Sequence, residues 1–175
     1  VKERYNGSGA TVRGFNVEGR AAFTRWFELQ AGVTLQQSRY KEPEFWSEDA
    51  EVPPVRRMFR TPDTYGYFTA SFKPVRNFTA DLSGTCTGSM LVQHMAGSGV
   101  AQDVAVSTPS FFDMNIRLSY DVRIYKEITM QLYGGVQNLF NAYQKDFDKG
   151  VDRDSGYIYG PSLPRSWFVG AKISF

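Results

Sequence analysis

The chain has 175 residues and a mass of 19.8 kDa, the size of one domain, and 20 Lys and Arg against 18 Asp and Glu leave a net charge of +2. The basic residues are scattered singly along the chain, which argues against nucleic-acid binding. No window approaches the roughly 18 apolar residues of a spanning helix, so a helical membrane protein is excluded. Aromatic residues make up 15% of the chain beside 16 glycines, a composition typical of strands and turns. The composition therefore predicts an all-β fold.

Alternating apolar and polar residues, the period-two pattern of a strand with one buried face, recur in seven segments. In chain order these segments cover residues 15–23, 27–35, 67–72, 78–90, 112–123, 128–137 and 167–175. The connections between them are alternately short, at 24–26, 73–77 and 124–127, and long, at 38–62, 93–110 and 139–164. An alternative count adds an eighth strand over residues 5–12. Cys86, the single cysteine, lies in the fourth segment, where it is interpreted as a small apolar residue.

Long strands with one apolar face, joined alternately by short turns and long loops, are typical of an outer-membrane β-barrel. Soluble sandwiches and barrels also alternate, but their strands usually have about five or six residues. Aromatic residues near the ends of the apolar faces suit the two membrane interfaces. The pattern therefore predicts an antiparallel transmembrane β-barrel. In it, Phe68, Leu82, Cys86, Ile116, Leu118, Leu132, Val169 and Ile173 face lipid, while Asp81, Asn115, Arg117, Gln131 and Lys172 face the lumen.

The last residues carry a recognisable pattern. The chain ends with Gly170-Ala171-Lys172-Ile173-Ser174-Phe175, a glycine followed by apolar residues three and five positions on, the second of them aromatic. This ending resembles the sorting signal that the outer-membrane assembly machinery reads, with Gly170, Ile173 and Phe175 as its key residues.

Upstream of this ending, three further segments resemble the C-terminal region of TonB-dependent receptors. They are Gly135–Gln144, which contains Asn138-Leu139-Phe140-Asn141, then Arg153–Pro161, and then Pro164-Arg165. Less specific resemblances at 84–97 and 108–113 are to receptors of Bacteroides-like bacteria. Together they extend the resemblance to most of the chain.

This resemblance implies that residues 1–175 form the C-terminal part of one receptor β-barrel, about the last seven strands of a barrel of about 22. The plug domain and the TonB-contacting region are then expected outside this sequence. The implied function is active import across the bacterial outer membrane of a scarce or large substrate, with iron-siderophores, haem or cobalamin favoured over glycans. The implied partners are outer-membrane lipid, the TonB complex, the barrel assembly machinery and a small-molecule substrate. The alternative is a small self-contained outer-membrane barrel with a structural or adhesion role.

The long loops carry the candidate functional residues, because aromatic side chains beside charged ones suit ligand recognition. We expect substrate contacts from Phe45, Trp46, Arg56, Arg57, His94, Tyr157 and Tyr159. The alternative for the first long loop is a variable surface loop. For His94, the only histidine, an interfacial residue is favoured over a haem or metal ligand.

Four closely spaced aspartates, Asp146, Asp148, Asp152 and Asp154, raise the question of a Ca²⁺ site in the last long loop. Their spacing does not match an EF-hand, and Lys145, Lys149 and Arg153 lie among them. A solvated, internally paired loop is therefore favoured, and neither a metal nor a cofactor is expected. The sequence has no Walker loop or Ser-His-Asp grouping, so we expect no enzyme activity.

Overall fold

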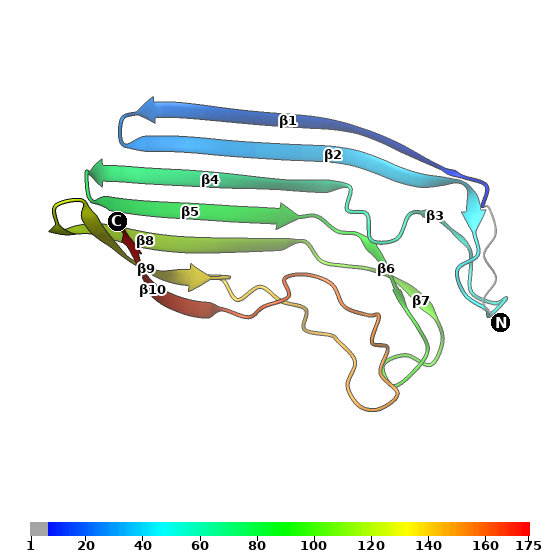
Figure 1. Ribbon diagram of the computed structural model, residues 1–175. Helices are drawn as coiled ribbons and strands as arrows, with labels where there is room; N and C mark the ends of the chain where they lie inside the picture. Colours follow the sequence, from blue (N-terminus) through cyan, green and yellow to red (C-terminus); the bar gives the residue numbers. More distant parts are fainter. Residues whose placement is uncertain (1–6) are drawn as a thin grey trace.

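The computed structural model describes residues 7–175, which form one antiparallel sheet and a separate two-stranded ribbon (Figure 1). Seven strands lie side by side in the order β1-β2-β4-β5-β8-β9-β10, β3 pairs with β2, and β6 pairs with β7 to form the ribbon. No helix in this part of the chain is long and apolar enough to cross a membrane. The strands are β1 (Ala10–Thr24), β2 (Phe27–Glu44), β3 (Val55–Arg57), β4 (Thr64–Val75), β5 (Phe78–Thr87), β6 (Leu91–His94), β7 (Val104–Ser107), β8 (Phe111–Tyr125), β9 (Ile128–Gln137) and β10 (Ser166–Ser174).

The seven predicted strands and the alternation of short and long connections are confirmed. Each short connection leaves two residues outside the strands, at positions 25–26, 76–77 and 126–127. The prediction of an eighth strand over 5–12 is wrong for its described part, because Ala10 already belongs to β1 and lies opposite Tyr40 of β2. Tyr5 lies outside the described residues. The strands β3, β6 and β7 were not predicted, since short pairings within loops carry little alternation.

The fourth predicted segment is shorter than its sequence pattern. The alternation continues to Met90, but β5 ends at Thr87. The backbone N–H of Gly88 donates a hydrogen bond at 2.7 Å to the carbonyl of Thr64, the first residue of β4. Beyond this point the chain leaves the sheet and continues into β6. Residues 88–90 of the predicted segment therefore belong to the loops and not to the wall of the sheet.

The register gathers the apolar residues of all seven strands on one face, because residues directly opposite each other on paired strands share a face. Leu82 of β5 lies opposite Ile116 of β8, and Ile116 lies opposite Val136 of β9. One position along, Asp81 lies opposite Arg117, so the polar residues gather on the other face. The predicted division of the strands into an apolar and a polar face is thus confirmed.

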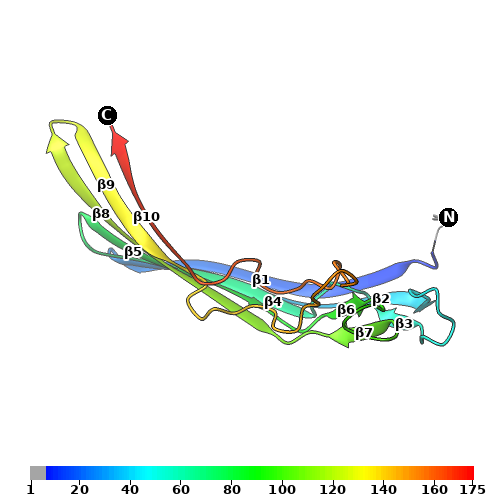
Figure 2. The ribbon, with the colours of Figure 1, turned by 90° about the horizontal axis from the view of Figure 1, so that it is seen from below.

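The apolar face is open to the surroundings. Leu118 of β8 is 46% exposed, and Val169 of the edge strand β10, on the same face, is 90% exposed. Figure 2 shows a single curved layer of strands, with β8, β9 and β10 bending away from the rest of the sheet. Within residues 7–175, β1 and β10 lie at opposite edges of the sheet and are not paired with each other. The sheet is therefore an open wall and not a closed barrel.

The buried apolar core lies away from the middle of the sheet. Its buried residues are Val92, Tyr157 and Tyr159, with Met90, Val106 and Phe111 packed around them. Most of these residues come from the long connections or from the β6-β7 ribbon. The long connections are consequently the part of the molecule with an interior of its own, and they are the place to look for a site.

Candidate functional site

The three long connections, residues 45–63, 88–110 and 138–165, lie at the same end of the sheet and are in contact with one another (Figure 1). We call them together the loop cluster; residues 45–63 are the first loop and residues 138–165 the final loop. Phe59 forms a parallel bridge with Leu91, and the backbone N–H of Arg60 donates to the carbonyl of Leu91 at 2.8 Å. The guanidinium of Arg60 also donates to the carbonyl of Ile158 at 3.0 Å. One arginine thus joins the first loop to both of the others.

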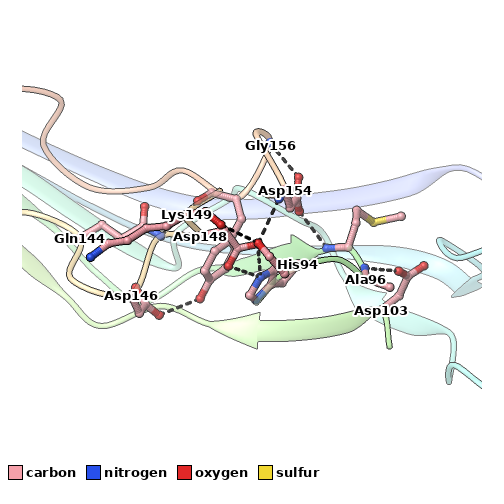
Figure 3. A network of polar contacts seen from close by, with 12 residues as sticks. His94, Ala96, Asp103, Gln144, Asp146, Asp148, Lys149, Asp154 and Gly156 are labelled. Carbon is pink, nitrogen blue, oxygen red and sulfur yellow. Dashed lines mark hydrogen bonds and ion pairs between the residues drawn. The ribbon is translucent and has the colours of Figure 1, made fainter. Parts of the chain in front are cut away.

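His94, at the end of β6, occupies the centre of the loop cluster (Figure 3). Its Nε2 lies 3.0 Å and 3.1 Å from the two carboxylate oxygens of Asp148. Its ring stacks on Tyr157 with 3.7 Å between ring centroids and 4° between the planes. The side chains of His94 and Asp148 are 8% and 3% exposed. The pair therefore fastens the β6-β7 ribbon to the final loop from inside the cluster.

Two tyrosines of the final loop share one carboxylate. The hydroxyl of Tyr157 donates to one oxygen of Asp146 at 2.8 Å, and that of Tyr159 donates to the other at 2.5 Å. Gln144 completes the arrangement, because its amide donates to the carbonyl of Tyr157 at 3.1 Å and accepts the backbone N–H of Tyr159 at 3.0 Å. Both tyrosine rings are consequently fixed at their polar and backbone ends.

These contacts shift the acidity of the groups involved. Burial would raise the pKa of Asp146, but the hydrogen bonds from Tyr159 and Tyr157 outweigh it and the pKa lies below its ordinary value. The backbone N–H of Asp154, helped by His94, lowers the pKa of Asp148. Burial, with the hydrogen bond to Asp146, raises the pKa of Tyr157 to about 12. The same two causes raise the pKa of Tyr159 above its ordinary value. At neutral pH the carboxylates are charged and the tyrosines are neutral donors.

The Asn138-Leu139-Phe140-Asn141 segment closes the final loop at its base. The side-chain amide of Asn138 donates to the carbonyls of Ala142 at 2.9 Å and Leu163 at 2.8 Å, and Asn141 accepts the backbone N–H of Arg165 at 3.0 Å. Both asparagines have a positive φ, 49° and 53°, a conformation that asparagine tolerates better than most residues. The segment thus holds the two ends of the loop together.

The predicted substrate-contact residues of the first loop differ in their surroundings. Phe45 is 69% exposed and Arg56 is also exposed. Trp46 donates its indole N–H to the carbonyl of Pro53 at 3.2 Å, while Arg57 forms an ion pair with Asp63 at 3.0 Å. Phe45 and Arg56 therefore present their side chains to the surroundings, whereas Trp46 and Arg57 are engaged within the chain.

The other predicted contacts lie inside the loop cluster. Counted over the whole residue, backbone included, His94, Tyr157 and Tyr159 are 6%, 2% and 6% exposed. His94 does not lie at the end of the fourth predicted strand, because β5 ends at Thr87 and His94 belongs to β6, where its ring stacks on Tyr157. Its role as an interfacial residue stays a prediction. In this arrangement the three side chains support the loops, and direct contact with a substrate stays a prediction.

The four aspartates do not converge on one point. Asp146 binds the two tyrosines, Asp148 binds His94, and Asp154 accepts the backbone N–H groups of Met95 at 2.8 Å and Gly156 at 2.7 Å. The prediction of internal pairing is right in kind, but the partners are a histidine, tyrosines and backbone amides and not the interleaved basic residues. In residues 7–175 no group of three or more His, Cys, Asp or Glu is placed to hold a metal ion. Asp152 contributes only its carbonyl, which accepts the N–H of Ser98 at 2.9 Å.

The final loop also contains a cavity of about 640 Å³. Its walls include the apolar side chains of Tyr143, Phe147, Ile158 and Leu163, and Arg153 is also among the lining residues. Sequence reasoning missed these residues, because they alternate neither as a strand nor as a helix. The only signal available in the sequence was a density of large apolar residues unusual for a loop.

The sequence and the fold of this chain give different results when they are compared with known proteins. No family model and no curated protein matches the sequence. Among solved structures, the chain is similar to the ferric-catecholate import receptor Fiu of E. coli K12 in its closed form, with a TM-score of 0.64 and 20% sequence identity. The similarity covers 93% of this chain. The chain therefore has the fold of part of that β-barrel. It spans 20% of the length of that receptor, and at this level of identity the similarity concerns the fold alone.

Proposed function

We propose that the chain forms part of the wall of an outer-membrane active-transport receptor. The observation that carries this proposal is the fold match to an import receptor over 93% of the chain. The open apolar face supports it, because side chains such as Leu118 and Val169 would have lipid and not water as their surroundings. The polar face, with Asp81 and Arg117, would then line the interior of the barrel.

The loop cluster would lie on the outer surface of the cell, since long loops are extracellular and short turns periplasmic in such barrels. There its exposed residues, Phe45 and Arg56 among them, would meet the substrate. The sequence resemblance favours an iron-siderophore, haem or cobalamin over a glycan, and the name of the similar receptor, a ferric-catecholate importer, agrees with this preference. Energy would come from the TonB complex through a plug and an N-terminal region outside this sequence.

The alternative function is a self-contained barrel with a structural or adhesion role. The open order of strands disfavours it, because β1 and β10 each have one edge without a partner in residues 7–175. Unpaired backbone groups are costly in lipid, so the isolated chain should neither close nor fold cooperatively in detergent. Heat-modifiable gel mobility and discrete conductance of residues 1–175 alone would favour the self-contained barrel.

The orientation can be tested with single cysteines in the full-length receptor on intact cells. Val151 in the final loop is 93% exposed, and Glu127 lies in the turn between β8 and β9. A membrane-impermeant maleimide should label Val151→Cys on intact cells, and should label Glu127→Cys only after the outer membrane is permeabilised. The unsubstituted protein controls for labelling of Cys86. Labelling of Glu127→Cys alone on intact cells would refute the proposed orientation.

A further inference from the structure

We propose that the cavity of the final loop is a binding pocket for a small molecule that combines an aromatic or apolar ring system with an anionic group. The proposal rests on the proposed function in one respect, namely that the loop faces the cell exterior. We call the cavity the final-loop pocket. Its volume of about 640 Å³ lies within the range of about 300–1,000 Å³ that is usual for small-molecule sites.

The apolar part of the pocket is formed by side chains that the fold leaves open. Tyr143, Phe147, Ile158 and Leu163 are 41%, 47%, 63% and 58% exposed, yet all four border the same cavity. Scattered exposed apolar residues are common on proteins, but several that border one concavity provide a surface that a ring system can cover. Removing this surface from water would be the main source of binding free energy.

The floor of the pocket is held in place before any ligand arrives. Tyr157 and Tyr159 are among its lining residues, and Asp146 and Gln144 fix both of them at the distances given above. His94, which is not among the lining residues, stacks on Tyr157 and so supports this floor. A pocket whose walls are already ordered loses less conformational entropy when it binds.

The charges around the pocket leave a positive group available. The carboxylates of Asp148 and Asp154 line the pocket, but both are occupied by internal donors: His94 and a backbone N–H for Asp148, two backbone N–H groups for Asp154. Arg153 donates from Nη1 to the carbonyl of Gly150 at 2.9 Å. In the part of the chain that the structure describes, no carboxylate forms an ion pair with this guanidinium. Its remaining N–H groups suit a planar anion such as a carboxylate.

The test uses the full-length receptor in nanodiscs with 2-naphthoate as the anionic probe and 2-naphthamide as its uncharged analogue, by isothermal titration calorimetry. Arg153→Gln should weaken naphthoate binding at least about tenfold, the size expected when a hydrogen-bonded charge is lost, and should leave naphthamide binding unchanged. Lys145→Gln removes the same charge from an exposed residue of the same loop that does not line the pocket, and it should change neither affinity.

A second variant keeps the test decisive if Arg153→Gln folds poorly. Ile158→Glu places a carboxylate on a 63% exposed position of the pocket wall and should weaken naphthoate more than naphthamide. Absence of naphthoate binding by the wild type, equal affinity in Arg153→Gln and wild type, or equal losses in Arg153→Gln and Lys145→Gln would overturn the proposal. If Val151→Cys is still labelled on intact cells, such a result concerns the pocket and leaves the proposed receptor function standing.

Discussion

At the scale of single residues, the closing pair of strands depends on a glycine for a steric reason. Gly170 of β10 lies opposite Tyr133 of β9, and a Cβ at Gly170 would lie 2.5 Å from the tyrosine ring. We expect Gly170→Val to lower the free energy of unfolding of the full-length protein by about 1–3 kcal/mol, the usual cost of overpacking. Ala171→Val, on the other face of β10, is the control. Equal denaturation midpoints for the two variants would contradict the packing argument.

A second residue-scale prediction concerns acidity in the loop cluster. The pKa of Tyr157 is raised from 10.0 to about 12, so the folded state holds this proton more tightly than the unfolded state. The resulting stabilisation is complete below pH 10 and is lost as the pH rises toward 12. Tyrosine absorbance should show one group titrating near pH 12 that Tyr157→Phe removes.

The carboxylate that accepts the hydroxyl of Tyr157 provides the control. Asp146→Asn should lower the pKa of Tyr157, because the hydrogen bond to Asp146 is one cause of its shift. The lowered pKa values of Asp146 and Asp148 make the stability of the folded state depend on pH in the acid range. The stabilisation is present above about pH 4 and is lost as the pH falls through the lowered values. A tyrosine titration that is identical in wild type, Tyr157→Phe and Asp146→Asn would show that the pair is not formed.

At the scale of elements, each strand of the wall has one apolar and one polar face, and the proposed function places lipid on the first and water on the second. Leu118 of β8 lies on the apolar face and is 46% exposed, whereas Thr69 of β4 lies on the polar face and is also exposed. In the proposed receptor, Leu118→Arg should cost about 2–4 kcal/mol if the residue sits near the bilayer midplane. Thr69→Arg should cost much less. Unfolding in lipid vesicles measures both, and equal costs would contradict the assignment of the faces.

At the scale of the whole molecule, the last residue is proposed to matter for assembly and not for transport. Phe175 follows the end of β10 and is 94% exposed, so it contributes little to packing within residues 7–175. Deleting it should lower the amount of receptor at the cell surface and leave the affinity of each folded molecule unchanged. Lys172→Ala, on the polar face, is the control and should be tolerated. Surface labelling and ligand binding on the same cells measure the two quantities.

Normal surface abundance with weakened binding in the Phe175 deletion would place this residue in the transport site and contradict the assembly role. Gly170 and Ile173 belong to the same proposed signal, but their variants are harder to interpret. Gly170 also packs against Tyr133, and Ile173 lies opposite Met130 on the apolar face. Phe175 is the one member of the signal whose removal leaves the sheet intact.

The sequence by itself determined the seven strands, their two faces and the short turns. These features are local, because alternation sets the face of each side chain and the turn fixes the register of the next strand. Leu82, Ile116 and Val136 share a face for this reason alone.

Only the tertiary structure decided the site. The contact of His94 with Asp148 joins residues 54 apart in the sequence, and that of Arg60 with Ile158 joins residues 98 apart. Neither loop has a period from which its partner could be inferred, since an irregular backbone takes its conformation from the surfaces it meets. The loop cluster exists because the sheet brings three such loops to one end, where they contact one another.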